Sequence, residues 1–183
     1  MRSSAIALFV LLLLTCALPG FAQSALDLAG NRVDPLAPNK VTVLVFIRSD
    51  CPISNRYAPE IQQMAEEFKD SASFWLVYPD RKETPQTIQK HLDDYGYKLP
   101  ALRDVDHELV KRGRATITPE AAVFRGTELE YVGRIDDRAI DFGVFRPVAK
   151  DRDLEVAIRD VVKGEPAPKP GGPAVGCYIS DLE

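Results

Sequence analysis

Cysteine and histidine are scarce in this chain of 183 residues, which contains three cysteines and two histidines. The cysteines lie far apart, at Cys16, Cys51 and Cys177, so no compact spacing of zinc ligands is present. A copper site is the remaining metal alternative, because thiolate and imidazole ligands suit copper. Its ligands would be Cys51, Cys177 and one of His91 and His107. Copper is only an alternative here, and the prediction from the sequence is that the protein holds no metal and no cofactor.

The chain also lacks a basic cluster and an internal repeat. Its formal net charge is −4, which gives no reason to expect a nucleic-acid partner. The composition, 45% hydrophobic and 27% charged, is that of an ordinary globular protein. The length suits one domain with a substantial core.

The first 22 residues have the pattern of a secretory signal. Arg2 precedes the apolar run Ala5–Leu14, and Gly20 and Ala22 suit the −3 and −1 positions of a cleavage site. The sequence therefore predicts a signal peptide at residues 1–22 and an exported protein, periplasmic or secreted.

Two alternatives would keep the protein at a membrane. An uncleaved anchor is disfavoured because the apolar run is too short to span a bilayer comfortably. A lipoprotein would be lipidated at Cys16, but Thr15 fits the required small residue poorly. We expect no stable membrane span after cleavage. Only Cys51 and Cys177 then remain, and two cysteines in an exported protein favour a disulfide.

The remaining pattern alternates strands and helices around one central stretch. Val41–Ile47 is a short, continuous apolar run, typical of a buried strand. A polar turn follows, and Cys51 stands where a helix begins, with Pro52 suited to the first helical position. The free N–H groups and the positive dipole end of a helix both favour a thiolate there.

Other segments complete an α/β pattern. A hairpin is expected at 24–36, a strand at 73–78, and strands at 121–124 and 129–135 that form a second hairpin. Helices are expected from Pro85, with Thr84 as its cap, from His107, and near residue 153, where Asp151 or Asp153 is the predicted cap. This order predicts a mixed α/β sandwich at residues 24–163. Residues 164–183 form a Pro/Gly-rich tail that carries Cys177 and is either mobile or strapped to the domain.

Two motifs carry a resemblance to a known superfamily. The segment CPISNRYAP is similar to the thioredoxin active site, with Cys51 at the nucleophilic cysteine and Pro59 at the helix-kinking proline. Ser54 occupies the place of the second cysteine. Thr118-Pro119 resembles the second thioredoxin landmark, a cis-proline facing the active-site cysteine. The overall pattern resembles the redoxin branch, which includes alkyl hydroperoxide reductase/thiol-specific antioxidant proteins and secreted thioredoxin-like proteins.

The resemblance implies a thioredoxin-like three-layer sandwich, with a central mixed β-sheet flanked by helices. It implies a thiol–disulfide oxidoreductase that acts on protein or small-molecule thiols and disulfides. Cys51 would be the nucleophile, and Thr118, Pro119 and Arg48 would line the substrate groove.

Ser54 changes what the single thiol can do. It can donate a hydrogen bond to a Cys51 thiolate, but it cannot resolve a mixed disulfide. Resolution then needs an external thiol, a partner protein or Cys177, which an extended tail of ~3.3 Å per residue can bring across the domain. We therefore hypothesise a Cys51–Cys177 pair. The pair is either redox-active or a permanent structural disulfide. In the chain-entropy model such a disulfide adds ~4–5 kcal/mol to the free energy of unfolding.

Two alternative functions stay open. A thiol peroxidase is the first, although Arg48 stands where peroxiredoxins carry Thr or Ser, three residues before the reactive cysteine. A non-catalytic binding or assembly module with a structural Cys51–Cys177 disulfide is the second. The segment Gly133–Arg138 (GRIDDR) is interpreted as a salt-bridged turn rather than as an acid–base pair. The sequence leaves the oligomeric state open.

Overall fold

The computed structural model describes residues 25–180 and 182. The predicted signal peptide, residues 1–22, lies outside the described residues. Within them, no helix has both the length and the apolar character needed to cross a membrane.

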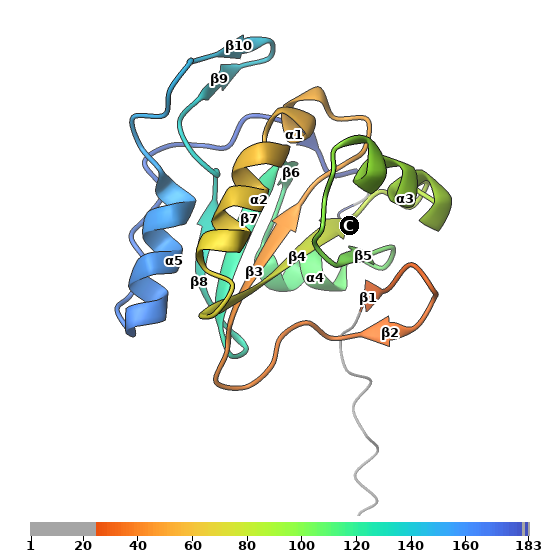
Figure 1. Ribbon diagram of the computed structural model, residues 1–183, viewed down its shortest axis with the longest axis horizontal. Helices are drawn as coiled ribbons and strands as arrows, with labels where there is room; N and C mark the ends of the chain where they lie inside the picture. The colour runs from red at the N-terminus through yellow and green to blue at the C-terminus, as the bar shows by residue number, and fades with distance from the viewer. Residues whose placement is uncertain (1–24, 181, 183) are drawn as a thin grey trace, which may run out of the picture.

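A mixed sheet of seven strands forms the centre of the molecule (Figure 1). The strands are β1 (Ala25–Leu26), β2 (Arg32–Val33), β3 (Val41–Phe46), β4 (Ala72–Tyr78), β5 (Ala101–Arg103), β7 (Glu120–Arg125) and β8 (Glu128–Gly133). Their order is β2-β1-β5-β4-β3-β7-β8. The neighbours β3, β4 and β5 run parallel, whereas β7 is antiparallel to both β3 and β8.

Strand β3 is buried on both faces, as its continuous apolar run predicts. Successive side chains of a strand point to opposite faces. Accordingly, Val43 and Val45 belong to one core cluster, whereas Leu44 and Phe46 belong to the other. The loop that carries Cys51 therefore leaves the most deeply packed strand of the sheet.

Five helices flank the sheet in the part of the chain that the structure describes. They are α1 (Pro52–Arg56), α2 (Ala58–Glu67), α3 (Pro85–Asp94), α4 (Glu108–Gly113) and α5 (Asp153–Lys163). Buried side chains of α2, α3 and α5 join one core cluster, and those of α4 join the other. Figure 1 views the sheet from the side of α2 and α5. Helices on both faces of a mixed sheet confirm the predicted three-layer sandwich.

The helix predicted after Cys51 is broken at Tyr57 into α1 and α2. Pro59 lies in the first turn of α2. In a continuous helix Pro59 would have no N–H for the carbonyl of Asn55, and its ring would clash with that carbonyl. The break turns Tyr57 into the core, where its side chain is buried.

Most of the predicted local signals are confirmed. The first hairpin pairs β1 with β2, and β7 and β8 form a second hairpin through Gly126, whose φ of 62° suits glycine. Thr84 caps α3, since its hydroxyl oxygen accepts a hydrogen bond from the Thr87 N–H at 3.1 Å.

The cap predicted for the last helix is wrong. Arg152 is the N-cap residue of α5 and makes no side-chain cap, while Asp153 is the first helical residue. The Asp153 carboxylate instead accepts hydrogen bonds from Arg134 Nε at 2.7 Å and from the Gly171 N–H at 2.6 Å. This carboxylate therefore fastens the tail rather than the helix terminus.

The tail is strapped to the domain. Residues 165–176, all described, form neither helix nor strand. The chain then forms β11 (Cys177–Tyr178), which pairs antiparallel with β6 (Ile117–Thr118), and Ile179 is buried in the core cluster beneath α4. Neither these short strands nor a third hairpin of β9 (Ala139–Asp141) and β10 (Val144–Phe145) is predicted from the sequence.

Candidate active site

Cys51 is the N-cap residue of α1 and is fully buried. Its carbonyl oxygen accepts the first hydrogen bond of the helix, from the Asn55 N–H at 3.0 Å. Helix α1 has only five residues, so its macrodipole is small. The nearby backbone N–H groups, rather than the dipole of a long helix, are what a thiolate would meet here.

The tail brings Cys177 against Cys51. The two sulfur atoms lie 2.9 Å apart, although the residues are 126 positions apart in the sequence. Both side chains are free thiols, and the Cys177 thiol donates a hydrogen bond to the Cys51 sulfur. The structure thus juxtaposes the two cysteines that the sequence singled out.

The two thiols have opposite pKa shifts. Burial, the largest influence, opposes ionisation of Cys51, but donors around its sulfur lower its pKa below the ordinary value. The donors are the thiol of Cys177, the hydroxyl of Ser54 and the backbone N–H groups of Ser54 and Ile53. Burial and the hydrogen bond to Cys51 raise the pKa of Cys177. Cys51 is therefore the thiol that ionises first, and Cys177 keeps its proton.

Ser54 lies in α1, three residues after Cys51, and is completely buried. Within the described chain its Oγ has no partner with full hydrogen-bond geometry. It nevertheless acts on Cys51 as a nearby donor that lowers the thiol pKa. A buried hydroxyl without another partner gains most when the sulfur becomes an anion.

The predicted cis-proline stands opposite Cys51. The peptide bond between Thr118 and Pro119 is cis, and Thr118 is fully buried. The Cys51 thiol donates to the Thr118 carbonyl oxygen across 3.3 Å. The Thr118 hydroxyl in turn donates to the carbonyl oxygen of Cys177 at 3.2 Å. One residue therefore contacts both cysteines.

Arg48 lies in the turn before Cys51, and two carboxylates hold its guanidinium. Its Nη2 lies 2.9 Å from Asp50 and 3.1 Å from Asp80. The positive charge of Arg48 opposes the rise in the Cys177 pKa, whereas the charge of Asp50 adds to it. Arg48 is thus close enough to influence the cysteine pair, but its charge is largely compensated.

A buried network that the sequence did not reveal supports the loop after β3. Glu83 accepts a hydrogen bond from the Ser49 N–H at 2.7 Å, and Asn55 Nδ2 donates to the Ser49 carbonyl oxygen at 3.0 Å. His91 Nε2 lies 2.8 Å from Asn55 Oδ1, and its Nδ1 lies 2.8 Å from the Tyr78 hydroxyl. Because Asn55 Oδ1 only accepts, Nε2 carries the imidazole proton. No local pattern marks these residues, since they meet only after folding.

The Glu83→Gln variant is expected to be more stable than the natural protein at neutral pH. Burial raises the pKa of Glu83 above its ordinary value of 4.5, and the charges of Asp80 and Asp50 add to this effect. When folding raises the pKa of a carboxyl group, the protein keeps its full stability below the unfolded-state pKa of that group. It loses stability as the pH rises through the folded-state pKa, because the buried group must then ionise. Glutamine retains an acceptor for the Ser49 N–H and has no charge to desolvate.

Urea unfolding of both proteins checks this expectation at about pH 4 and about pH 8. The difference in the free energy of unfolding should be small at the lower pH and should favour Glu83→Gln at the higher pH. A difference that is independent of pH would contradict the argument.

The two histidines considered for a copper site are used elsewhere. His91 belongs to the network under the loop, and His107 Nε2 lies 2.9 Å from the Pro79 carbonyl oxygen. Among residues 25–180 and 182, no group of three His, Cys, Asp or Glu side chains is arranged to hold a metal ion. The structure therefore brings Cys51 and Cys177 together without a histidine.

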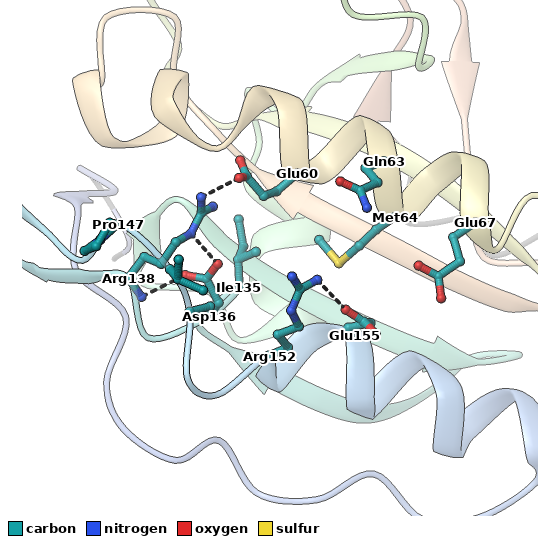
Figure 2. A pocket seen from close by; sticks show the side chains of 12 residues that line it. Glu60, Gln63, Met64, Glu67, Ile135, Asp136, Arg138, Pro147, Arg152 and Glu155 are labelled. Carbon is teal, nitrogen blue, oxygen red and sulfur yellow. Dashed lines mark hydrogen bonds and ion pairs between the residues drawn. The ribbon is translucent and has the colours of Figure 1, made fainter.

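A cavity of about 240 Å³ lies between α2 and α5, away from the cysteines. Figure 2 shows Arg138 between Glu60 and Asp136, and Arg152 beside Glu155. The charged groups that line this cavity are thus engaged in ion pairs, Glu67 with Arg159 outside the lining, and none of the lining residues is a cysteine. The segment GRIDDR leaves the end of β8 as an irregular stretch rather than a turn, and its charged side chains form the predicted ion pairs: Arg134 with Asp153, Arg138 with Asp136, and Asp137 with Arg146.

The chain is similar in fold to several solved structures. A crystal structure of an uncharacterized conserved protein from Geobacillus kaustophilus has a TM-score of 0.69 and 24% identity, covering 85% of this chain and 86% of that chain. A hypothetical protein from Sinorhizobium meliloti 1021 has a TM-score of 0.70 and 23% identity, covering 85% and 88%. The exposed lipoprotein thioredoxin of Streptococcus pneumoniae has a TM-score of 0.54 and 18% identity, covering 77% and 97%. No curated protein matches the chain.

The sheet order, the cysteine at the start of α1 and the cis-proline opposite it define a thioredoxin-like protein, and the solved structures share that fold. Within this class the sequence model of the AhpC/TSA family matches residues 16–129. The chain belongs to the AhpC/TSA family.

Proposed function

We propose that the protein carries out thiol–disulfide exchange on a protein or small-molecule disulfide, with Cys51 as nucleophile and Cys177 as resolving thiol. The observation that carries the proposal is the sulfur pair at 2.9 Å, with opposite pKa shifts on its two members. A nucleophile must be a thiolate, and a resolving thiol must lie close to the sulfur that it attacks.

The exchange takes place in two steps, and in each step one sulfur–sulfur bond forms as another breaks. The Cys51 thiolate attacks a partner disulfide, which forms a mixed disulfide with Cys51 and releases one partner sulfur as a thiolate. Cys177 then loses its proton and attacks the Cys51 sulfur, which releases the second partner thiolate and forms a Cys51–Cys177 disulfide. The partner gains two electrons, the protein loses two, and an external thiol reductant restores the dithiol.

Three residues position this chemistry. Ser54 stabilises the Cys51 thiolate from within α1, while Thr118 and Pro119 form the opposite wall. Arg48 borders the same site, but its pairing with Asp50 and Asp80 leaves little charge for polarising a peroxide. This pairing is why we favour thiol–disulfide exchange over the peroxidase alternative.

We further propose that the protein is exported and that residues 1–22 are removed. The charged, apolar and small-residue regions of this segment support the proposal. A two-cysteine exchange pair also suits an oxidising compartment. Residues 24–163 would then be the redoxin domain, and residues 164–183 a functional tail.

Substitution of Cys51 tests the proposed function. The Cys51→Ser variant is expected to lower catalysed reduction of a protein disulfide by dithiothreitol to the uncatalysed rate. The Ser54→Ala variant, in contrast, is expected to retain activity but to be about threefold to tenfold slower at neutral pH, because one donor to the thiolate is lost. Full activity in Cys51→Ser would overturn the proposal.

A further inference from the structure

The strand that carries Cys177 occupies an edge of the active site. Strand β11 pairs antiparallel with β6, with Cys177 opposite Thr118. The Thr118 hydroxyl donates to the Cys177 carbonyl oxygen at 3.2 Å, and the Ile179 N–H donates to the Thr116 carbonyl oxygen at 3.0 Å. The tail therefore lies in this edge as an extended segment held by backbone hydrogen bonds.

This docking closes the site to partners. Cys51 has no exposed surface, and the Cys177 sulfur covers it at 2.9 Å. A partner disulfide must reach the Cys51 sulfur itself, so β11 has to leave before exchange with a partner begins. Its departure frees the backbone groups of β6, and a free strand edge pairs readily with another extended segment.

Gly176 is the residue that lets Cys177 dock. A Cβ at this position would lie 2.0 Å from the Thr118 carbonyl oxygen and 3.1 Å from Pro119 Cδ. Neither contact involves the flexible end of a side chain, so the neighbours cannot yield easily. Any residue other than glycine immediately before the docked cysteine would push the strand off the edge.

We infer that the tail is an intramolecular occupant of the edge that binds the partner, and that the partner presents an extended segment with glycine directly before its reacting cysteine. The inference rests on the proposed function and adds to it the partner's class. Pairing with β6 holds the segment in register, and the space above Thr118 selects glycine. The tail and the partner compete for one edge.

The rest of the tail can stay attached while β11 leaves. Gly171 is held by the Asp153 carboxylate, and the guanidinium of Arg134 lies against Gly171 and Gly172. This anchor lies upstream of the docked strand and does not involve β6. Cys177 therefore remains tethered and returns to resolve the mixed disulfide.

The full-length Gly176→Ala variant tests the steric part of the inference. With the reduced protein, at a pH where Cys51 is ionised in both forms, the alkylation rate of Cys51 by iodoacetamide is followed by peptide mass spectrometry. We expect the variant to react about tenfold faster than the natural protein, or more, because the tail no longer covers the sulfur. The matched control is Lys169→Ala, which changes an exposed tail residue that lies before the anchor at Gly171, and it should react at the natural rate.

A peptide supplied separately tests the selection of glycine. The probe is Ala-Val-Gly-Ser-Tyr-Ile-Ser, which corresponds to residues 174–180 with serine in place of Cys177, and the control peptide has alanine in place of its glycine. Only the glycine peptide should protect Cys51 of the Gly176→Ala variant from iodoacetamide. Equal protection by both peptides, or an unchanged alkylation rate in Gly176→Ala, would overturn the inference.

These readouts do not depend on turnover. Protection by the glycine peptide together with inactivity in the reductase assay would contradict the proposed function but support the docking of an extended segment on β6. Turnover without selective protection would contradict the docking inference and leave the proposed function supported.

Discussion

Replacing Cys177 with serine should turn the protein into a trap for its partner. Cys51 can still attack a partner disulfide, but no sulfur lies beside it to release the product. Serine also keeps a hydroxyl that can donate to the Cys51 thiolate, so the first step should remain intact. Catalysed turnover should fall by at least about a hundredfold, because a positioned thiol is replaced by thiols from solution.

The measurement is the mass of protein adducts formed under non-reducing conditions. Cys177→Ser should accumulate mixed disulfides at Cys51, and the double variant Cys51→Ser with Cys177→Ser should accumulate none. Unchanged turnover in Cys177→Ser, with no accumulated adduct, would show that an external thiol resolves the intermediate.

Replacing Asp136 with alanine should destabilise the protein by about 3–5 kcal/mol, because it removes one partner of a buried ionic network. Asp136 accepts hydrogen bonds from the Tyr57 hydroxyl at 2.6 Å and from Arg138 Nε at 2.7 Å. Figure 2 shows the same Arg138 reaching Glu60 on α2. The network ties the break between α1 and α2 to the segment after β8. A loss of this size is a large part of the ~5–15 kcal/mol that stabilises a typical domain.

Chemical denaturation of the variant gives this free energy, and Asp136→Asn is the matched control. Asparagine keeps an acceptor for Tyr57 and for the Arg138 N–H, so it should lose less stability than alanine. Burial, followed by contact with Asp136, raises the pKa of Tyr57, and both substitutions should lower it towards the ordinary value. Equal stability of the natural protein and Asp136→Ala would contradict the role of the network.

The central part of the site could be predicted because its signals are local. A continuous apolar run, a polar turn and a proline after the cysteine place Cys51 at the start of a helix whatever the rest of the chain does. Thr118-Pro119 is similarly marked by its own dipeptide. The break at Tyr57 follows from Pro59 two residues later.

The docking of the tail could not be predicted, because a Pro/Gly-rich segment has no periodicity from which a register can be read. Gly176 acquires its meaning only from the position of the Thr118 carbonyl oxygen. The support from Glu83 was missed for a related reason, since its contact with Ser49 spans 34 residues. The cap predicted for α5 failed because Arg134 and the tail compete for the Asp153 carboxylate. Local propensity gave way to tertiary contacts at that position.

The reduction potential of the Cys51–Cys177 pair tests most directly whether the pair takes part in thiol–disulfide exchange or only forms a structural disulfide that holds the tail. The full-length protein is equilibrated with graded mixtures of reduced and oxidised glutathione, and of reduced and oxidised dithiothreitol for lower potentials, and the Cys51–Cys177 disulfide is quantified by mass. Donors that stabilise the Cys51 thiolate favour the reduced form, so we expect a potential between about −270 and −120 mV, the range of exchange catalysts. A potential below about −300 mV, typical of structural disulfides, would contradict the proposed function.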